Sequence, residues 1–305
     1  MGMDILKMLE EGVVLSDGGM IIEARWRGYD TPAMILEDPD ALRQIHQDFF
    51  RAGSHVLQAQ TWWTSRSQLE RRYEQGDGPS GEAVRLEEIS RTAIRLAIEA
   101  SGGEALVAGC LNQTAAGSWT GPHIYRPDNA RARERACAEW DEHISWMVDA
   151  GAGLLVPETF ARLDEARLCL SCCKKTDVPA MVLMGSSSRT HDGATPAECA
   201  KVLADEGADI VGLVCSGDSM TMWPGVLAMR EAVDIPIAYQ PQGYRNAGPN
   251  NSVIRESMIV SGSEMAQYAL KARAEGVNFI GACCGAGPSH IRAIAQALGC
   301  ERNPV

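Results

Sequence analysis

The 305-residue chain has few basic residues, no long apolar run and no recognisable export signal. Lysine and arginine number 28 against 40 aspartate and glutamate, which gives a formal net charge of −12. So acidic a chain repels nucleic-acid phosphates and anionic lipids, so we expect no nucleic-acid partner and no membrane-surface role. No apolar run approaches the roughly 18 residues that a transmembrane helix requires.

The N-terminal stretch, MGMDILKMLEEG, also lacks the basic and apolar regions of a signal peptide. We therefore expect a cytoplasmic protein. In that compartment the ten cysteines are predicted to be reduced thiols, metal ligands or small buried residues rather than disulfides.

Eight short apolar runs alternate with amphipathic segments along the chain. The runs begin at Val13, His55, Ala105, Gly153, Pro179, Asp209, Pro236 and Phe279. They are β-branched and bounded by Gly or Pro, as is typical of buried parallel strands. Between the runs, helical apolar spacing occurs in residues 39–51, 82–100, 131–147, 195–206 and 262–274.

Eight strand–helix units predict an α/β fold of the (β/α)8 TIM-barrel type, with a doubly wound open sheet as the alternative. No linker or low-complexity tract divides the chain, so residues 1–305 are predicted to form a single barrel domain, with no second domain. A long polar segment, residues 243–252 (GYRNAGPNNS), follows the seventh predicted strand and is a candidate flap.

Polar and thiol side chains gather at the C-terminal ends of the predicted strands, where barrel enzymes place their chemistry. They are Asp17, Gln60, Thr61, Glu158, Cys215, Cys283 and Cys284. Three thiols from two strand ends, with glycines flanking the vicinal pair, suit a tetrahedral zinc site that has one open position. The alternative is that Cys215 and Cys284 are small buried strand residues.

A second thiol group, Cys169, Cys172 and Cys173, has the i, i+3, i+4 spacing of one helix face. Such spacing is typical of core packing, and the group lies on a predicted helix rather than at a strand end. We expect these thiols to pack in the core, with a metal between Cys169 and Cys172 as the alternative.

Five ordered segments resemble the homocysteine S-methyltransferase family and are most similar to its betaine–homocysteine branch. The segments are LSDGGMI (from Leu15), RGYDTPAMILEDPDALRQIHQDFFRAGSHVLQ (from Arg27), VPETFARLDEA (from Val156), GADIVGLVC (from Gly207) and NFIGACCGAGPSHIRAIA (from Asn278). The resemblance spans residues 14–298 and implies both the barrel fold and a methyltransferase activity.

The resemblance implies that Cys215, Cys283 and Cys284 hold a Zn²⁺ ion. Zinc lowers the pKa of a thiol that it binds, so homocysteine would be present as a thiolate at neutral pH. That thiolate would displace a neutral leaving group from the methyl carbon of an onium donor, of the betaine or S-methylmethionine type, and give methionine. Both substrates would be small molecules.

The resemblance also implies where the amino-acid end of homocysteine binds. The backbone amides of Gly18 and Gly19 would hold its carboxylate, in a turn that Asp17 shapes. Glu158 would receive its ammonium group and supply the counter-charge that orients the amino acid.

The chain departs from the family pattern near the thiols and in the donor pocket. Val214 precedes Cys215 where the family has Asn. Trp63, which cannot bind zinc, stands where the betaine branch has a tyrosine that closes the zinc shell, and Asp30 and Thr159 replace two aromatic residues of its donor cage. Trp63 is still a candidate donor-binding residue, because a Trp face attracts an onium group by roughly 0.5–2 kcal/mol.

Three hypotheses follow. The first is a zinc-dependent S-methyltransferase that uses homocysteine and an onium donor. The second is a related zinc barrel that methylates a different thiol, which Val214 and the altered segment LNQTAAGSW (from Leu111) motivate. The third is a non-catalytic relative that binds zinc and an amino acid. All three hypotheses are compatible with a homo-oligomer.

Overall fold

Eight short buried strands form the centre of the structure, a computed structural model that describes residues 3–29, 33–62, 64, 85–113, 128–245 and 258–301. The strands are β1 (Val14–Leu15), β2 (Val56–Gln58), β3 (Leu106–Leu111), β4 (Leu154–Phe160), β5 (Met181–Met184), β6 (Ile210–Val214), β7 (Ile237–Gln240) and β8 (Phe279–Ile280). Each coincides with one of the eight predicted runs, although β3 and β4 end one residue beyond theirs, so all eight strand predictions are confirmed.

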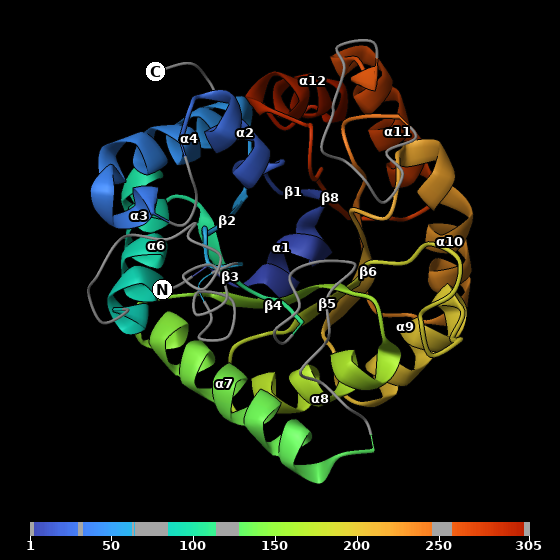
Figure 1. Cartoon of the computed structure of the whole chain (residues 1–305). Coiled ribbons are helices and arrows are strands. Elements are labelled where there is room, and N and C mark those ends of the chain that lie inside the picture. The colour runs from blue at the N-terminus through green and yellow to red at the C-terminus, as the bar shows by residue number, and fades with distance from the viewer. Residues whose placement is uncertain are drawn as a thin grey trace.

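All neighbouring strands pair in parallel, in the order β1-β8-β7-β6-β5-β4-β3-β2. A parallel bridge between Ser16 and Val56 joins β1 to β2, and the His55 N–H donates to Leu15 O at 2.7 Å. This pairing closes the sheet, and helices surround it (Figure 1). The predicted (β/α)8 TIM barrel is confirmed, and the open-sheet alternative is excluded.

The described helices alternate with the strands. They are α1 (Ile5–Glu11), α2 (Met20–Trp26), α3 (Met34–Glu37), α4 (Pro39–Ala52), α6 (Leu86–Ala100), α7 (Ala130–Asp149), α8 (Leu163–Cys173), α9 (Pro196–Asp205), α10 (Ser219–Ala232), α11 (Gly262–Ala274) and α12 (Pro288–Leu298). The five predicted helices correspond to α4, α6, α7, α9 and α11, and residues 82–84 of the second prediction lie outside the described residues.

Apolar side chains fill two layers, one inside the barrel and one between the strands and the outer helices. Helix α1 lies across the centre of the ring in Figure 1, and its Ile5 and Leu9 pack with strand residues such as Val56 and Phe279 in the inner layer. The inner layer therefore fills the barrel, as in other barrels of this size. In the described part of the chain, no helix is long and apolar enough to cross a membrane.

The second thiol group lies in the outer layer. Cys169, Cys172 and Cys173 of α8 are all buried among apolar side chains, and burial raises the pKa of Cys169 and Cys172 well above the usual value. They are not part of any candidate metal cluster found among the described residues. The prediction that they pack in the core is confirmed.

Two histidines are buried in the outer layer as neutral rings. Burial lowers the pKa of His46 in α4 to about 3 and that of His143 in α7 to about 4. The His143 Nε2 atom lies 3.1 Å from the hydroxyl of Thr64, so this ring also links α7 to the segment after β2.

We expect these rings to make the fold sensitive to acid. Each folded pKa lies below the unfolded value of 6.5, so the stability they contribute is complete above pH 6.5 and is lost as the pH falls below it. Urea unfolding at pH 7 and pH 5 should show a smaller loss of stability for His143→Gln than for the natural chain, by about 2 kcal/mol. Equal losses would show that His143 does not titrate in this range.

Candidate active site

Three thiols meet at the mouth of the barrel formed by the C-terminal ends of the strands. Cys215 directly follows β6, while Cys283 and Cys284 lie three and four residues after β8. All three Sγ atoms lie within 4.8 Å of one another, and those of the vicinal pair are 3.9 Å apart. The structure thus brings together the three cysteines that the sequence predicts, and each is half-buried.

Backbone pairing continues past the strand ends and positions these thiols. The Cys215 N–H donates to Gln240 O at 3.1 Å, and the Cys283 N–H donates to Pro241 O at 2.8 Å. Cys215 has a φ of 53°, a left-handed conformation that costs a non-glycine residue about 1–3 kcal/mol. The surrounding hydrogen bonds hold Cys215 in that conformation and so aim its sulfur at the pair.

Hydrogen bonds among the thiols favour one thiolate and disfavour the others. Contacts from Cys283 and Cys284 hold the pKa of Cys215 well below its usual value, whereas contact with Cys215 is the main factor that raises the pKa of the other two thiols. A cation between the three sulfurs would favour the thiolate form of Cys283 and Cys284 as well.

The thiol cluster fits a soft divalent metal. Sulfur ligands of a tetrahedral Zn²⁺ lie about 3.8 Å apart, given Zn–S bonds of about 2.3 Å. The 3.9 Å separation of the vicinal pair matches that spacing without rearrangement. Thiolates favour zinc over the hard cations Mg²⁺ and Ca²⁺. Within the described residues this is the one group of three or more possible ligands that lie close enough together to hold a metal.

Two carboxylates lie at the same mouth. Asp17 is fully buried and accepts a hydrogen bond from the Gln58 N–H at 2.8 Å through Oδ2, while its Oδ1 has no partner among the residues that the structure describes. Burial, and then the charge of Glu158, raise the pKa of Asp17 well above its usual value. Burial, and then the charge of Cys215, raise the pKa of Glu158 to about 8. Burial thus disfavours the charged form of both carboxyl groups, and a cationic group bound beside them would favour that form.

The turn after β1 that contains Gly18 and Gly19 packs directly on the turn that contains Cys283 and Cys284, which we call the glycine turn and the cysteine turn. A Cβ atom on Gly19 would lie 2.8 Å from the Cα of Cys284, and one on Gly18 would overlap the carbonyl oxygen of Ala286. The Gly19 N–H already donates to Ala286 O at 2.9 Å. The predicted carboxylate-binding turn is therefore adjacent to the thiols, with one of its amides engaged inside the fold.

Other polar strand-end residues have structural roles. Thr61 accepts from the Cys110 N–H at 2.8 Å and donates to Cys110 O at 3.0 Å, so it ties β2 to β3 rather than lining the thiol site. Val214 is buried in the inner apolar layer. Trp63, Asp30 and residues 246–252 of the predicted flap lie outside the described residues.

Sequence reasoning missed a set of amides and a thiol inside the barrel. Gln58 donates to Cys110 Sγ at 3.4 Å, Gln240 donates to Gln58 Oε1 at 3.0 Å, and Gln242 donates to Cys215 O at 2.8 Å. Glutamine in a strand of apolar residues is the signal that could have indicated them, because a buried amide needs partners.

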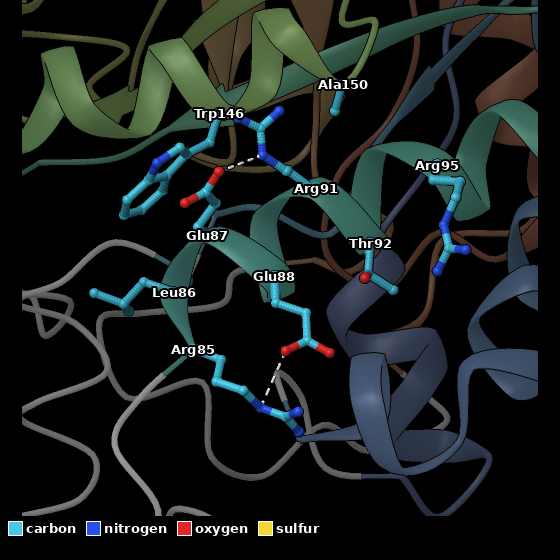
Figure 2. Close-up of a pocket in the computed structure, with 9 residues that line it drawn as sticks. All are labelled: Arg85, Leu86, Glu87, Glu88, Arg91, Thr92, Arg95, Trp146 and Ala150. Carbon is cyan, nitrogen blue, oxygen red and sulfur yellow. Dashed lines mark hydrogen bonds and ion pairs between the residues drawn. The ribbon is translucent and has the colours of Figure 1, made fainter.

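A hollow of about 780 Å³ lies elsewhere, over α6 and the end of α7. Figure 2 shows its charged lining, in which Arg91 pairs with Glu87 and Arg85 pairs with Glu88. These pairs neutralise one another at the surface of the outer helical layer. The hollow therefore does not belong to the thiol site.

Chemistry at the carboxyl ends of barrel strands is typical of (β/α)8-barrel enzymes, and a thiol cluster narrows that class to enzymes with a soft-metal site. Within it, the chain belongs to the homocysteine S-methyltransferase family, whose model matches residues 14–298. The resemblance found in the sequence is thereby confirmed. The chain is a methyltransferase of the type that acts on homocysteine, which sets aside the hypothesis of a non-catalytic relative.

Individual relatives agree with this assignment. The chain is 34% identical to betaine–homocysteine S-methyltransferase 1 of Danio rerio, over 98% of this chain and 76% of the relative. It is 33% identical to S-methylmethionine–homocysteine S-methyltransferase BHMT2 of Pongo abelii, over 98% and 82%. The metallated form of the homocysteine methyltransferase MmuM from Escherichia coli has the same fold, with a TM-score of 0.75 at 19% identity, covering 96% of this chain and 99% of that one.

Gly285 tests how tightly the cysteine turn is packed. It has a φ of 85°, and an added Cβ would overlap the ring of Tyr244; Gly103 has a φ of 81° and nothing within 4 Å of an added Cβ. Alanine should therefore cost about 1–2 kcal/mol at Gly103, from backbone strain alone, and about 1–3 kcal/mol more at Gly285. Urea unfolding measures both, and equal losses would show that the Tyr244 contact is loose.

Proposed function

We propose that the protein transfers a methyl group from a small onium donor to the sulfur of homocysteine, with zinc at the cysteine cluster, and so makes methionine. The observation that carries the proposal is the convergence of three thiols, within 4.8 Å of one another, beside the carboxylate of Glu158. Soft ligands and a counter-charge for an ammonium group are what a thiol amino acid requires of its site.

Cys215, Cys283 and Cys284 would hold the zinc, and they leave one of the four tetrahedral positions for the substrate sulfur. When bound, zinc lowers the pKa of a coordinated thiol, so the acceptor is a thiolate at neutral pH.

Acceptor atoms around the cluster suit the ammonium end of the substrate. Asp17 Oδ1, Gln240 Oε1 and Gln242 Oε1 are buried and have no hydrogen-bond partner among the described residues, and Glu158 adds a carboxylate. A bound ammonium group would satisfy acceptors of this kind and restore the ordinary ionisation of Glu158. The turn at Gly18 and Gly19 lies beside the same thiols and would receive the carboxylate.

The methyl donor should be cationic because the mouth is acidic. A cationic donor that loses its methyl group leaves as a neutral molecule, so the chain need not supply a proton. The protein would then contribute mainly by aligning the donor's methyl group with the acceptor sulfur. Trp63 remains our candidate for the onium face of the donor.

Titration calorimetry with L-homocysteine tests the acceptor without a known donor. Zinc-loaded protein should bind homocysteine and release protons, metal-stripped protein should not, and the loaded enzyme should form methionine with glycine betaine or S-methylmethionine. No binding to protein that holds stoichiometric zinc would contradict the homocysteine assignment and favour a different thiol acceptor.

Removal of one ligand should remove the metal. Cys283→Ser is expected to weaken zinc binding at least about 100-fold and to abolish turnover, because a thiolate donor is lost. Cys137→Ser is the control, since Cys137 is also half-buried but lies on α7. Chelator competition measures both, and stoichiometric zinc of natural affinity in Cys283→Ser would contradict the ligand assignment.

Glu158→Gln should weaken homocysteine binding about 10- to 100-fold, which corresponds to loss of one hydrogen bond between charged groups. The zinc content should be unchanged. The matched probe is 4-mercaptobutyrate, which is homocysteine without its amino group, and its affinity should be the same for both proteins. An equal effect on both thiols would show that Glu158 does not contact the ammonium group.

A further inference from the structure

Two polar side chains beyond the C-terminal end of β7 lie at the thiol cluster, and neither is among the residues that the sequence predicts for the site. Gln242 and Tyr244 are both buried, with exposures of 4% and 1%. The chain between them is held against the cysteine turn, because the Gly243 N–H donates to Cys284 O at 2.8 Å.

Gln242 lies on the Cys215 side of the cluster. Its Nε2 donates to Cys215 O at 2.8 Å and lies 3.5 Å from Cys215 Sγ. An N–H group at this distance can donate to a thiolate, and the bond to the carbonyl keeps the amide in place while it does so.

Tyr244 lies on the Cys284 side. Its ring covers Gly285, where an added Cβ would overlap the ring, and its phenol lies close enough to Cys284 for the two groups to interact electrostatically. The backbone of Tyr244 pairs with Ile259 in an antiparallel bridge, which the bond from the Val260 N–H to Gly243 O at 2.8 Å extends. These contacts hold the ring of Tyr244 beside the turn that contains Cys283 and Cys284.

We infer that Gln242 and Tyr244 are positioning residues of the metal centre, which donate hydrogen bonds to the thiolates of Cys215 and Cys284. Three thiolates around a divalent cation carry an excess negative charge, and a substrate thiolate adds another. Donors on the protein sulfurs spread that charge and make those sulfurs poorer nucleophiles. The substrate sulfur, which lacks these donors, is then the one that reacts with the methyl donor. This inference rests on the proposed metal site.

Tyr244→Phe is the test, because it keeps the ring contact and removes only the hydroxyl. In the full-length protein loaded with Co²⁺, the thiolate-to-cobalt charge-transfer band should move to lower energy, since the sulfur electrons are no longer stabilised by a donor. Affinity for Co²⁺, measured by chelator competition, should fall about tenfold. An unchanged band together with unchanged affinity would overturn the role of Tyr244.

The control is Tyr239→Phe, at a tyrosine within β7. The Tyr239 hydroxyl donates to Ser219 O, so its removal should lower thermal stability and leave the cobalt band where it was. Gln242→Leu removes the other donor and should shift the band in the same direction, which keeps the inference testable if Tyr244→Phe does not fold. Absence of any thiolate-to-cobalt band in the natural protein would contradict the metal site itself, a result distinct from an unshifted band.

Discussion

The mouth of this barrel depends on the pairing of β8 between β1 and β7. The pairing extends beyond the two strand residues: Ala282 donates to Asp17 O at 3.1 Å on one side, and Cys283 donates to Pro241 O at 2.8 Å on the other. Glycine permits the approach, because a side chain on Gly19 would meet the Cys284 backbone. The vicinal thiols, the glycine turn and the end of β7 are thus held as one unit, to which β6 adds Cys215.

Electrostatics then limits what this unit can bind. Burial disfavours charge on Asp17 and Glu158, and contact with Cys215 disfavours it on Cys283 and Cys284. Positive charge inside the mouth would offset that cost. A thiophilic dication, an ammonium group and an onium methyl donor would each supply it. The same constraint accounts for a site in which Asp17 Oδ1, Gln240 Oε1 and Gln242 Oε1 have no hydrogen-bond partner among the described residues.

The outer helical layer supports the site but takes no part in it. Its ion pairs, such as those of Arg91 with Glu87 and Asp149, lie at the surface and contribute little individually. The hollow over α6 is larger than the space a metal ion needs, yet each of the arginines given for its lining pairs with a nearby carboxylate. The thiol site differs from the hollow in the reactive groups that meet there, and not in its volume.

The sequence by itself determined the eight strands, the barrel, the family and the three thiols, because strand patterning and strand-end residues are local signals. It also indicated Asp17 and Glu158, which follow or end strands in an obvious way. Only the tertiary structure decided that Gln242 and Tyr244 face Cys215 and Cys284. Whether a side chain two or four residues beyond a strand turns toward the mouth depends on pairing with segments far away in the chain, here the cysteine turn and the bridge to Ile259. Such long-range contacts leave no periodic trace in the sequence.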